Sequence, residues 1–250
     1  MKYLVLIFLS CYLLSCEKDN ETVEEPTSQP PTNLNLNPNL TYGSVADAEG
    51  NEYATIVIDT QEWMAENLNT TKYANGDPIP NVIVGAQWTS LTTGAWVHYN
   101  HDSQYKNPYG KLYNWYTVAD PRNVCPTGWR VPSENEWSNL INYLDTNSVF
   151  NPSQNTGGGK MKSVGTQYWQ SPNEDATNES GLTCLPGGYF SGGGTFGNIG
   201  VQGNMWSSSE GLGQFSTVNA FFITLDKGNG SATMVTTSKQ AGFSVRCIRD

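Results

Sequence analysis

An acidic segment midway along the chain carries side chains that could bind a hard cation. Five of its residues have carboxylate or amide oxygens: Asn173, Glu174, Asp175, Asn178 and Glu179. Such oxygens are the ligands that Ca²⁺ prefers in proteins. Their spacing follows no regular calcium loop, and a solvated acidic loop would have the same composition. The sequence leaves both interpretations open, with calcium as the one candidate cofactor.

Other motifs that could do chemistry are incomplete. His98 and His101 could meet a metal ion, but the sequence shows no evident third ligand, so surface-loop histidines are the simpler interpretation. The stretch GGGKMKS suggests a phosphate-binding loop, but Met161 follows Lys160 where that loop needs Ser or Thr. No Ser-His-Asp set or carboxylate pair can be assigned from spacing. We therefore expect a protein that is not an enzyme.

Aromatic side chains in predicted loops offer a different kind of site. They stand among Asn, Gln and Thr residues, and they are Trp88, Trp96, Tyr99, Tyr168 and Trp169. Aromatic faces beside amide groups suit stacking on sugar rings or contacts with peptides. Alternatively, these rings fill an irregular core. The sequence predicts a ligand surface if they are exposed.

The N-terminus has the features of an export signal. Lys2 precedes an apolar run over residues 3–14, which is too short for a comfortable membrane span. The run ends in Leu-Leu-Ser-Cys, which resembles a bacterial lipobox, so residues 1–15 are predicted to be removed and Cys16 to be lipidated. An ordinary secretory signal with a chance cysteine is the alternative. Residues 17–21, EKDNE, resemble the surface-export signal of Bacteroidetes lipoproteins.

A polar segment follows the lipobox. Residues 16–42 are acidic at first and then rich in Pro and Asn, which predicts a disordered tether between the membrane and a folded domain. The whole chain of 250 residues has a formal net charge of -10. It has no basic stripe that could displace counterions from phosphates, which argues against nucleic acid as a partner.

The elements that must position any site follow from residue 43 onwards. A β-hairpin is predicted from residue 53 to Trp63 with a turn at Asp59 and Thr60, and a helix over residues 112–119. Ser133 and Glu136 form a capping box before a helix with a single apolar stripe, Trp137, Leu140, Ile141 and Leu144. Strands return over residues 204–209, 218–225 and 243–250. The sequence predicts one loop-rich α+β domain over residues 43–250, with two main helices and a C-terminal antiparallel sheet.

The cysteines fit an oxidising compartment. Cys11 leaves with the signal and Cys16 is the anchor, so Cys125, Cys184 and Cys247 remain. Three cysteines allow one disulfide and one free thiol. The residues alone leave the pairing open.

Six blocks of sequence resemble the Fibrobacter succinogenes major paralogous domain in their order. They are GNEYATIVIDTQEWMAENLNTTKYANGDPIP, YGKLYNWYTV, CPTGWRVPSENEW, SGLTCLPGG, MWSSS and GFSVRCIRD, and they extend from residue 43 to residue 250. The resemblance implies a C-type lectin-like fold, which is shared with formylglycine-generating enzymes. In that fold a disulfide commonly ties the terminal strand to the helical part, which implies a bond between Cys125 and Cys247. Cys184 is then a core thiol.

The active sites of those relatives do not carry over. Formylglycine-generating chemistry needs two reactive cysteines, and only Cys184 would be free. The Glu-Pro-Asn and Trp-Asn-Asp motifs of calcium-dependent lectins are absent. We therefore expect an outer-membrane lipoprotein, exposed on the cell surface, that displays a non-catalytic binding or adhesion module for a glycan or a protein. A structural envelope or surface-assembly component and an enzyme of unrecognised type are the alternatives.

Overall fold

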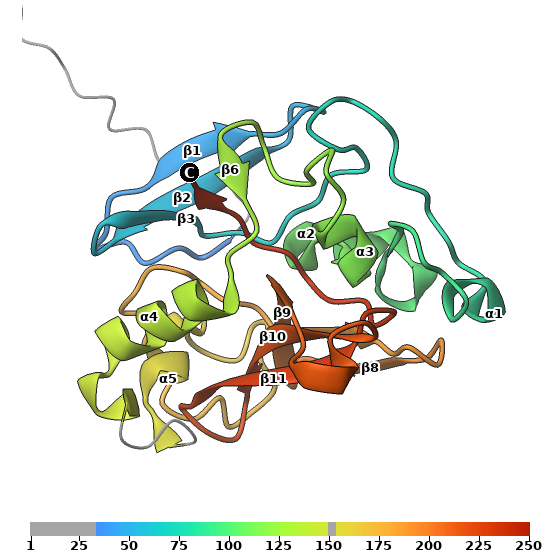
Figure 1. The fold of residues 1–250 in the computed structure, drawn as a ribbon. Helices are drawn as coiled ribbons and strands as arrows, with labels where there is room; N and C mark the ends of the chain where they lie inside the picture. The colour runs from blue at the N-terminus through green and yellow to red at the C-terminus, as the bar shows by residue number, and fades with distance from the viewer. Residues whose placement is uncertain (1–33, 150–153) are drawn as a thin grey trace, which may run out of the picture.

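The structure is a computed structural model that describes residues 34–149 and 154–250. The predicted signal, the lipidated Cys16 and residues 17–33 of the predicted tether lie outside the described residues. Two five-stranded sheets dominate the described part, with the strand orders β1-β2-β3-β12-β6 and β11-β10-β9-β7-β8 (Figure 1). A short pair, β4 with β5, forms a third sheet. The mixed helix-and-sheet class is confirmed.

The first sheet joins both ends of the described domain. Its strands are β1 (Gly43–Ala46), β2 (Glu52–Ile58), β3 (Gln61–Met64), β12 (Ile248–Arg249) and β6 (Trp129–Arg130). The predicted hairpin is confirmed, because β2 and β3 pair with Ile58 opposite Gln61. Asp59 in the turn has a φ of 56°, a left-handed conformation that Asp tolerates better than most residues do. The C-terminal strand β12 lies between β3 and β6.

The second sheet carries the longer strands. They are β7 (Gly187–Phe190), β8 (Phe196–Ile199), β9 (Gln202–Glu210), β10 (Asn219–Asp226) and β11 (Ala232–Ser238). One face of this sheet packs Met205, Ile223 and Leu225 into a core with α4 (Glu134–Leu144) and α5 (Gly157–Met161). Both helices lie on one side of the sheet, at the lower left of the view (Figure 1). The predicted C-terminal antiparallel sheet is formed by β9, β10 and β11.

Helix α4 begins as the capping box predicts. Ser133 Oγ accepts a hydrogen bond from the Glu136 amide at 3.3 Å, and Glu136 Oε2 accepts one from the Ser133 amide at 2.8 Å. All four residues of the predicted apolar stripe are buried. Capping therefore fixes where the helix starts, and burial of the stripe fixes which side faces the sheets.

The predicted helix over residues 112–119 is wrong in its first part. Leu112 and Tyr113 form β5, which pairs with β4 (Trp96–Val97), and a single turn, α3 (Trp115–Val118), follows. Asn114 separates the two elements, because its side-chain oxygen accepts from the Thr117 amide and so starts the turn. Only α4 among the described helices exceeds five residues, so the two main helices expected reduce to one.

The remaining helices are single turns. They are α1 (Gly85–Trp88), α2 (Lys106–Tyr109) and the 3₁₀ turns η1 (Tyr99–His101), η2 (Ser103–Tyr105), η3 (Thr146–Val149) and η5 (Gly213–Phe215). No helix in the described ranges is long and apolar enough to cross a membrane.

The last residues assigned to the tether pack against the fold. Leu34 and Tyr42 are buried, and Leu36 and Leu40 contact the core beneath α4 and the first sheet. The Tyr42 hydroxyl donates to the Gly181 carbonyl at 3.0 Å. Residues 34–42 therefore belong with the domain structurally, because their apolar side chains have a surface to bury against.

The disulfide implied by the resemblance is present. Cys125 and Cys247 are bonded, with their Cα atoms 5.9 Å apart and a sequence separation of 122 residues. Cys184 is buried and free, as expected, and burial raises the pKa of its thiol. The bond ties β12 to the segment that leads into β6.

Arg246 anchors the terminal segment from inside the protein. Its side chain is fully buried, and it donates to Asn67 Oδ1 at 3.0 Å and to the carbonyls of Met64, Leu182 and Thr183. A buried guanidinium is tolerated when its donors are satisfied in this way. Segments from three parts of the chain are thus held to one side chain.

Candidate functional site

The aromatic surface predicted from the loops is mostly core. Trp88 and Trp169 are fully buried, and their indole N–H groups donate to the carbonyls of Gln240 and Cys184 at 2.6 and 3.1 Å. Tyr99 is also buried. Irregular segments have no regular alternation of buried and exposed side chains. Their large aromatic rings fill the core instead. As exposed ligand contacts, these three predictions are wrong.

A buried cation lies beside the predicted calcium segment. The side chain of Lys162 is fully buried, and its ammonium group donates to the carbonyls of Glu174, Asp226 and Asn229 at 2.7, 3.0 and 2.9 Å. Three carbonyl oxygens and three ammonium hydrogens match in number. The lysine therefore supplies the positive charge that this acidic loop needs.

The other members of that segment serve the fold separately. Asn173 donates to the Ser163 and Gly165 carbonyls, and Asn178 accepts from the Thr183 amide. Glu174 and Asp175 are exposed, as is Glu179, which forms an ion pair with Lys160 at 3.4 Å. No group of three His, Cys, Asp or Glu side chains within residues 34–149 and 154–250 could hold a metal ion. Glu174, Asp175 and Glu179 therefore do not form such a group.

Each of the two histidines packs edge-on against an aromatic ring. His98 lies edge-on to Trp96, with ring centroids 5.1 Å apart, and His101 lies edge-on to Phe196 at 4.8 Å. Desolvation lowers the pKa of both imidazoles, and for His98 the nearby Lys111 and Lys106 lower it further. Both rings are therefore held against aromatic neighbours as neutral groups near pH 7.

A row of tyrosines does come together on the surface. Ring centroids are 5.3 Å apart from Tyr99 to Tyr105, 6.3 Å from Tyr105 to Tyr109, and 6.4 Å from Tyr109 to Tyr168. Tyr99 is the buried end, while Tyr105, Tyr109 and Tyr168 are half-buried. We call these four residues the tyrosine row. Two predicted residues, Tyr99 and Tyr168, are the two ends of the row, and the two between them were missed by the sequence analysis.

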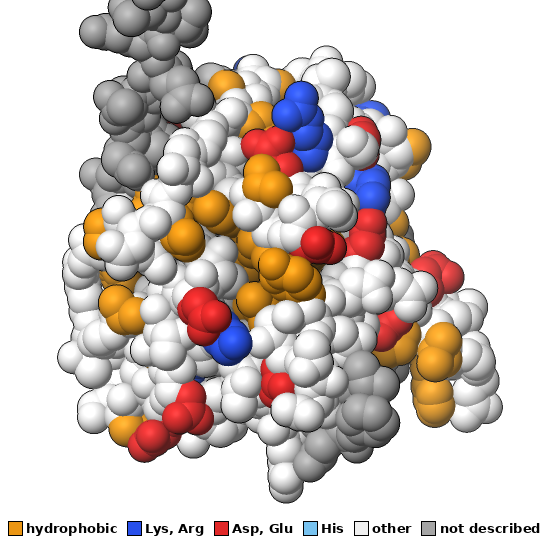
Figure 2. Space-filling model, turned by 90° about the vertical axis from the view of Figure 1, so that its left-hand side faces the viewer, with side chains coloured by type: hydrophobic (Ala, Val, Ile, Leu, Met, Phe, Trp, Pro, Cys, Tyr) orange, Lys and Arg blue, Asp and Glu red, His pale blue; other side chains and the backbone are white. Residues whose placement is uncertain are grey.

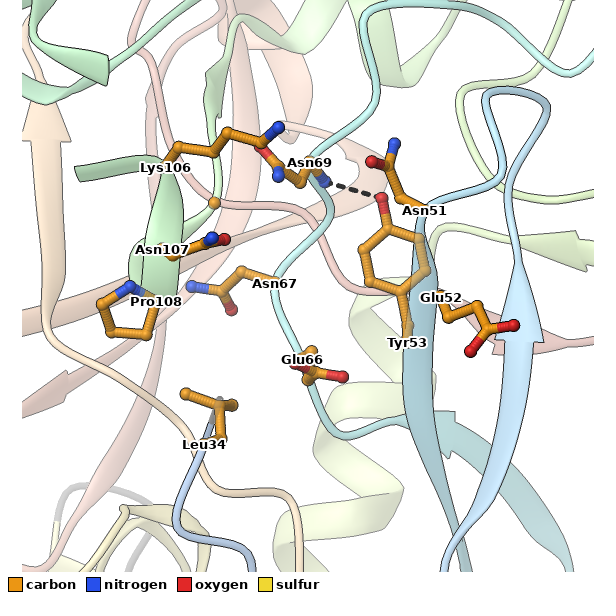
Figure 3. Close-up of a pocket in the computed structure, with 11 residues that line it drawn as sticks. Leu34, Asn51, Glu52, Tyr53, Glu66, Asn67, Asn69, Lys106, Asn107 and Pro108 are labelled. Carbon is orange, nitrogen blue, oxygen red and sulfur yellow. Dashed lines mark hydrogen bonds between the residues drawn. The ribbon is translucent and has the colours of Figure 1, made fainter. Parts of the chain in front are cut away.

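A polar cavity of about 200 Å³ opens beside the tyrosine row. Its walls are the start of β2, the segment 66–69 after β3, the turn 106–110 and Leu34. Figure 3 shows Lys106, Asn107 and Pro108 on one side, with Asn67 pointing across the gap towards them. The row and the cavity share the turn α2, since Tyr109 is its last residue and the Asn67 amide donates to the Tyr109 carbonyl at 3.0 Å.

Close backbone contact holds this turn in place. Gly110 has a φ of +74°, and a Cβ built there would lie 2.7 Å from the Leu68 carbonyl oxygen. Only glycine fits both the backbone conformation and this approach. The residue therefore fixes α2 against the segment 66–69.

Most polar groups inside the cavity are engaged with the fold. Asn67 also accepts from Arg246, and the Tyr53 hydroxyl donates to Asp47 at 2.6 Å and accepts from the Asn69 amide at 3.0 Å (Figure 3). Glu66 accepts from the Ala54 amide at 2.6 Å. These contacts make the inner wall rigid.

The outer wall carries the groups that can contact a ligand. Lys106 and Asn107 are exposed on α2, and neither side chain has a hydrogen-bond or ion-pair partner among the residues that the structure describes. The neighbouring Lys111 is buried outside the cavity lining, where it donates to Asn69 Oδ1 at 2.8 Å and lies over the half-buried Trp96 ring at 4.9 Å. Desolvation, with the charge of Lys106, lowers the pKa of Lys111 to about 8. Trp96 itself is a support for this lysine, with its own N–H donating to the Ile79 carbonyl.

Together, the tyrosine row and the outer wall suit binding more than bond-breaking. The rings of Tyr105 and Tyr109 lie on the same short segment as the ammonium group of Lys106 and the amide group of Asn107. No regular helical spacing could have found them, because Asn107 between the two tyrosines has a non-helical backbone (φ -113°, ψ 120°).

The match to known families decides the classification. The family model described as the Fibrobacter succinogenes major domain matches residues 56–249. The chain belongs to this family. The match contains the segment 66–69 and all four members of the tyrosine row, so the candidate site lies within the Fibrobacter succinogenes major domain. No curated protein and no solved structure matches the chain significantly.

Proposed function

We propose that the protein is a binding module for an extracellular glycan and that the tyrosine row is where the glycan binds. The observation that carries the proposal is the gathering of Tyr105, Tyr109 and Tyr168 as partly exposed rings beside Lys106 and Asn107. Aromatic faces stack on the C–H faces of sugar rings, while amide and ammonium groups donate to sugar hydroxyls.

The proposal is for binding without turnover. The carboxylate of Glu66 at the cavity is engaged with the backbone of β2, and the ammonium of Lys111 is engaged with Asn69. General acid and base groups need to reach a reacting atom of the substrate. Groups already used to hold the walls are better placed to stabilise the site than to move protons.

We further propose that Cys16 carries the lipid anchor and that the domain faces outwards from the outer membrane. Support comes from the lipobox-like LLSC and the acidic segment behind it. The C-type lectin-like fold implied by the resemblance is part of the same proposal. Protease treatment of intact cells should release the domain, and Cys16→Ser should abolish membrane attachment. Protection from the protease would favour a structural role inside the envelope.

The binding proposal is tested by presenting the detergent-solubilised full-length protein to an array of plant, host and microbial glycans. We expect at least one glycan class to bind, and Tyr105→Ala or Tyr109→Ala to lower its affinity by about tenfold. Tyr143→Ala is the matched control, because Tyr143 is an exposed tyrosine on α4, outside the row. Equal binding by all three variants would exclude the tyrosine row. An absence of glycan binding, together with a protein cross-linked to the domain on cells, would favour the structural-assembly alternative.

A further inference from the structure

The second sheet divides at its middle. β7 pairs with β9 in parallel at Gly188 and Gly203. Two residues later, Phe190 has left β9 and exchanges backbone hydrogen bonds with Gly242, at 2.9 and 2.6 Å. The strands therefore diverge around residues 242–244, which pair with Phe190 of β7 and with Met205 of β9. We call this divergence, with the face of β9, β10 and β11 beside it, the fork.

A glycine lets β7 lie close to β8 beside the fork. Gly188 has a φ of +65°, and a Cβ placed there would lie 2.4 Å from the Gly197 carbonyl oxygen. A side chain would have to push β8 away from β7. Gly188 therefore fixes the close approach of β7 to β8 at the edge of the fork.

A cavity of about 310 Å³, open to solvent, lies at the fork. Tyr189 lines it from β7, and Phe222 lies on β10. The Phe222 ring contacts the Phe243 ring with centroids 4.4 Å apart, which gives the cavity an aromatic floor. None of the side chains that line the cavity is charged.

Three hydroxyl groups in the cavity have no task in the fold. Thr224, Thr237 and Tyr189 form no side-chain hydrogen bond with any residue that the structure describes, yet all three face the same hollow. This contrasts with the cavity beside the tyrosine row, whose inner polar groups are engaged. A purely apolar occupant would leave these hydroxyls desolvated without a partner, which is costly. A charged occupant would find no opposite charge in the lining.

We infer that the fork between β7 and β9 is a second binding site, for an uncharged ring-shaped polyol such as one pyranose unit of a neutral saccharide. The aromatic floor takes a face of the ring, and the threonine and tyrosine hydroxyls exchange hydrogen bonds with its hydroxyls. The site uses no residue of the tyrosine row, so it stands whether or not the row binds a glycan.

The test titrates the full-length protein in detergent with hexasaccharides of β-1,4-glucan, β-1,4-xylan, β-1,4-mannan and α-1,4-glucan. We expect at least one to bind, and Thr224→Val and Thr237→Val each to weaken it by about tenfold, because each loses one hydroxyl at nearly constant volume. Thr236→Val is the matched control, since Thr236 is exposed on the same strand and neighbours Thr237 on the opposite face.

Tyr109→Ala separates this site from the tyrosine row. Binding that survives Tyr109→Ala but weakens in Thr224→Val supports the fork. The inference is overturned if none of the four saccharides binds the folded protein, if Thr224→Val and Thr236→Val bind equally, or if Tyr109→Ala alone abolishes all binding. The last outcome would leave the proposed function standing without a second site.

Discussion

Single buried cations hold this domain together where regular structure is sparse. Lys162 and Arg246 are both fully buried, and both donate mainly to backbone carbonyls in loops and at strand ends. Loops leave many carbonyls without a partner, and a long cationic side chain can satisfy several of them at once. Side-chain donors in this domain therefore make some of the hydrogen bonds to backbone carbonyls that longer helices would make within themselves.

Replacing Lys162 by Met tests this role. We expect the free energy of unfolding to fall by about 2 to 4 kcal/mol, because three carbonyls lose their donor in a buried site. Urea denaturation measures the change. Lys160→Met is the control, because its ion pair with Glu179 is on the surface and such pairs contribute little.

The same residue predicts how the protein responds to calcium. Because the ammonium of Lys162 already fills the carbonyl cage, millimolar CaCl₂ should leave the melting temperature of the wild-type protein unchanged. Thermal unfolding with CaCl₂ and with EDTA decides the matter. A calcium-dependent rise would revive the predicted calcium site.

Elements in this domain are short, so their ends matter more than their interiors. Glu136 of α4 accepts hydrogen bonds from the Ser133 amide and from both terminal nitrogens of Arg130, at 2.8, 2.8 and 2.6 Å. The bonds to Arg130 and Ser133 lower the pKa of Glu136 to about 2. One carboxylate thus joins the helix start to β6 in the first sheet.

Glu136→Gln should expose this contribution through pH. A carboxyl with a depressed folded-state pKa stabilises the protein above its unfolded value near 4.5, and the contribution is lost as pH falls towards 2. We expect the wild-type protein to be more stable than Glu136→Gln by about 1 kcal/mol at pH 7, and the difference to shrink between pH 4.5 and 2. Urea denaturation across that range measures it. Glu134→Gln, two residues earlier in the first turn of α4, is the control. Its stability difference from the wild-type protein should be smaller and should vary less with pH.

On the scale of the whole molecule, the two sheets are joined by the terminal segment. Residues 242–249 pair with β7, β5 and β3 in turn. The Cys125–Cys247 bond links this segment to the residues that precede β6. On the face that carries α4, the few basic side chains lie beside acidic ones (Figure 2), as in the pairs Arg130–Glu136 and Arg249–Glu62. Other acidic side chains on this face lie away from any basic one (Figure 2), in line with the formal net charge of -10.

Removing either half of the disulfide should have the same effect. We expect Cys125→Ser and Cys247→Ser each to destabilise the domain by about 2 to 4 kcal/mol, because the bond closes a long loop and so restricts the unfolded chain. Adding a thiol reductant should bring the wild-type protein close to both variants. Unequal losses, or two titratable thiols in the native oxidised protein, would contradict the pairing.

The sequence by itself determined the features that depend on near neighbours. The β2–β3 turn at Asp59 and Thr60 and the capping box at Ser133 were predicted at the right residues. Turns and helix ends are set by hydrogen bonds between residues a few positions apart, so they can be recognised in a short stretch. The family resemblance added the Cys125–Cys247 bond, which no local pattern specifies.

Only the tertiary structure decided what the irregular segments do. Trp88 and Trp169 turned out to be core, the Lys162 ammonium was found to bind the Glu174 carbonyl of the predicted calcium segment, and the tyrosine row was assembled from residues 99–109 and 168. The physical reason is that a loop has no repeating side-chain direction, so burial or exposure of each residue depends on what packs against it from elsewhere in the chain.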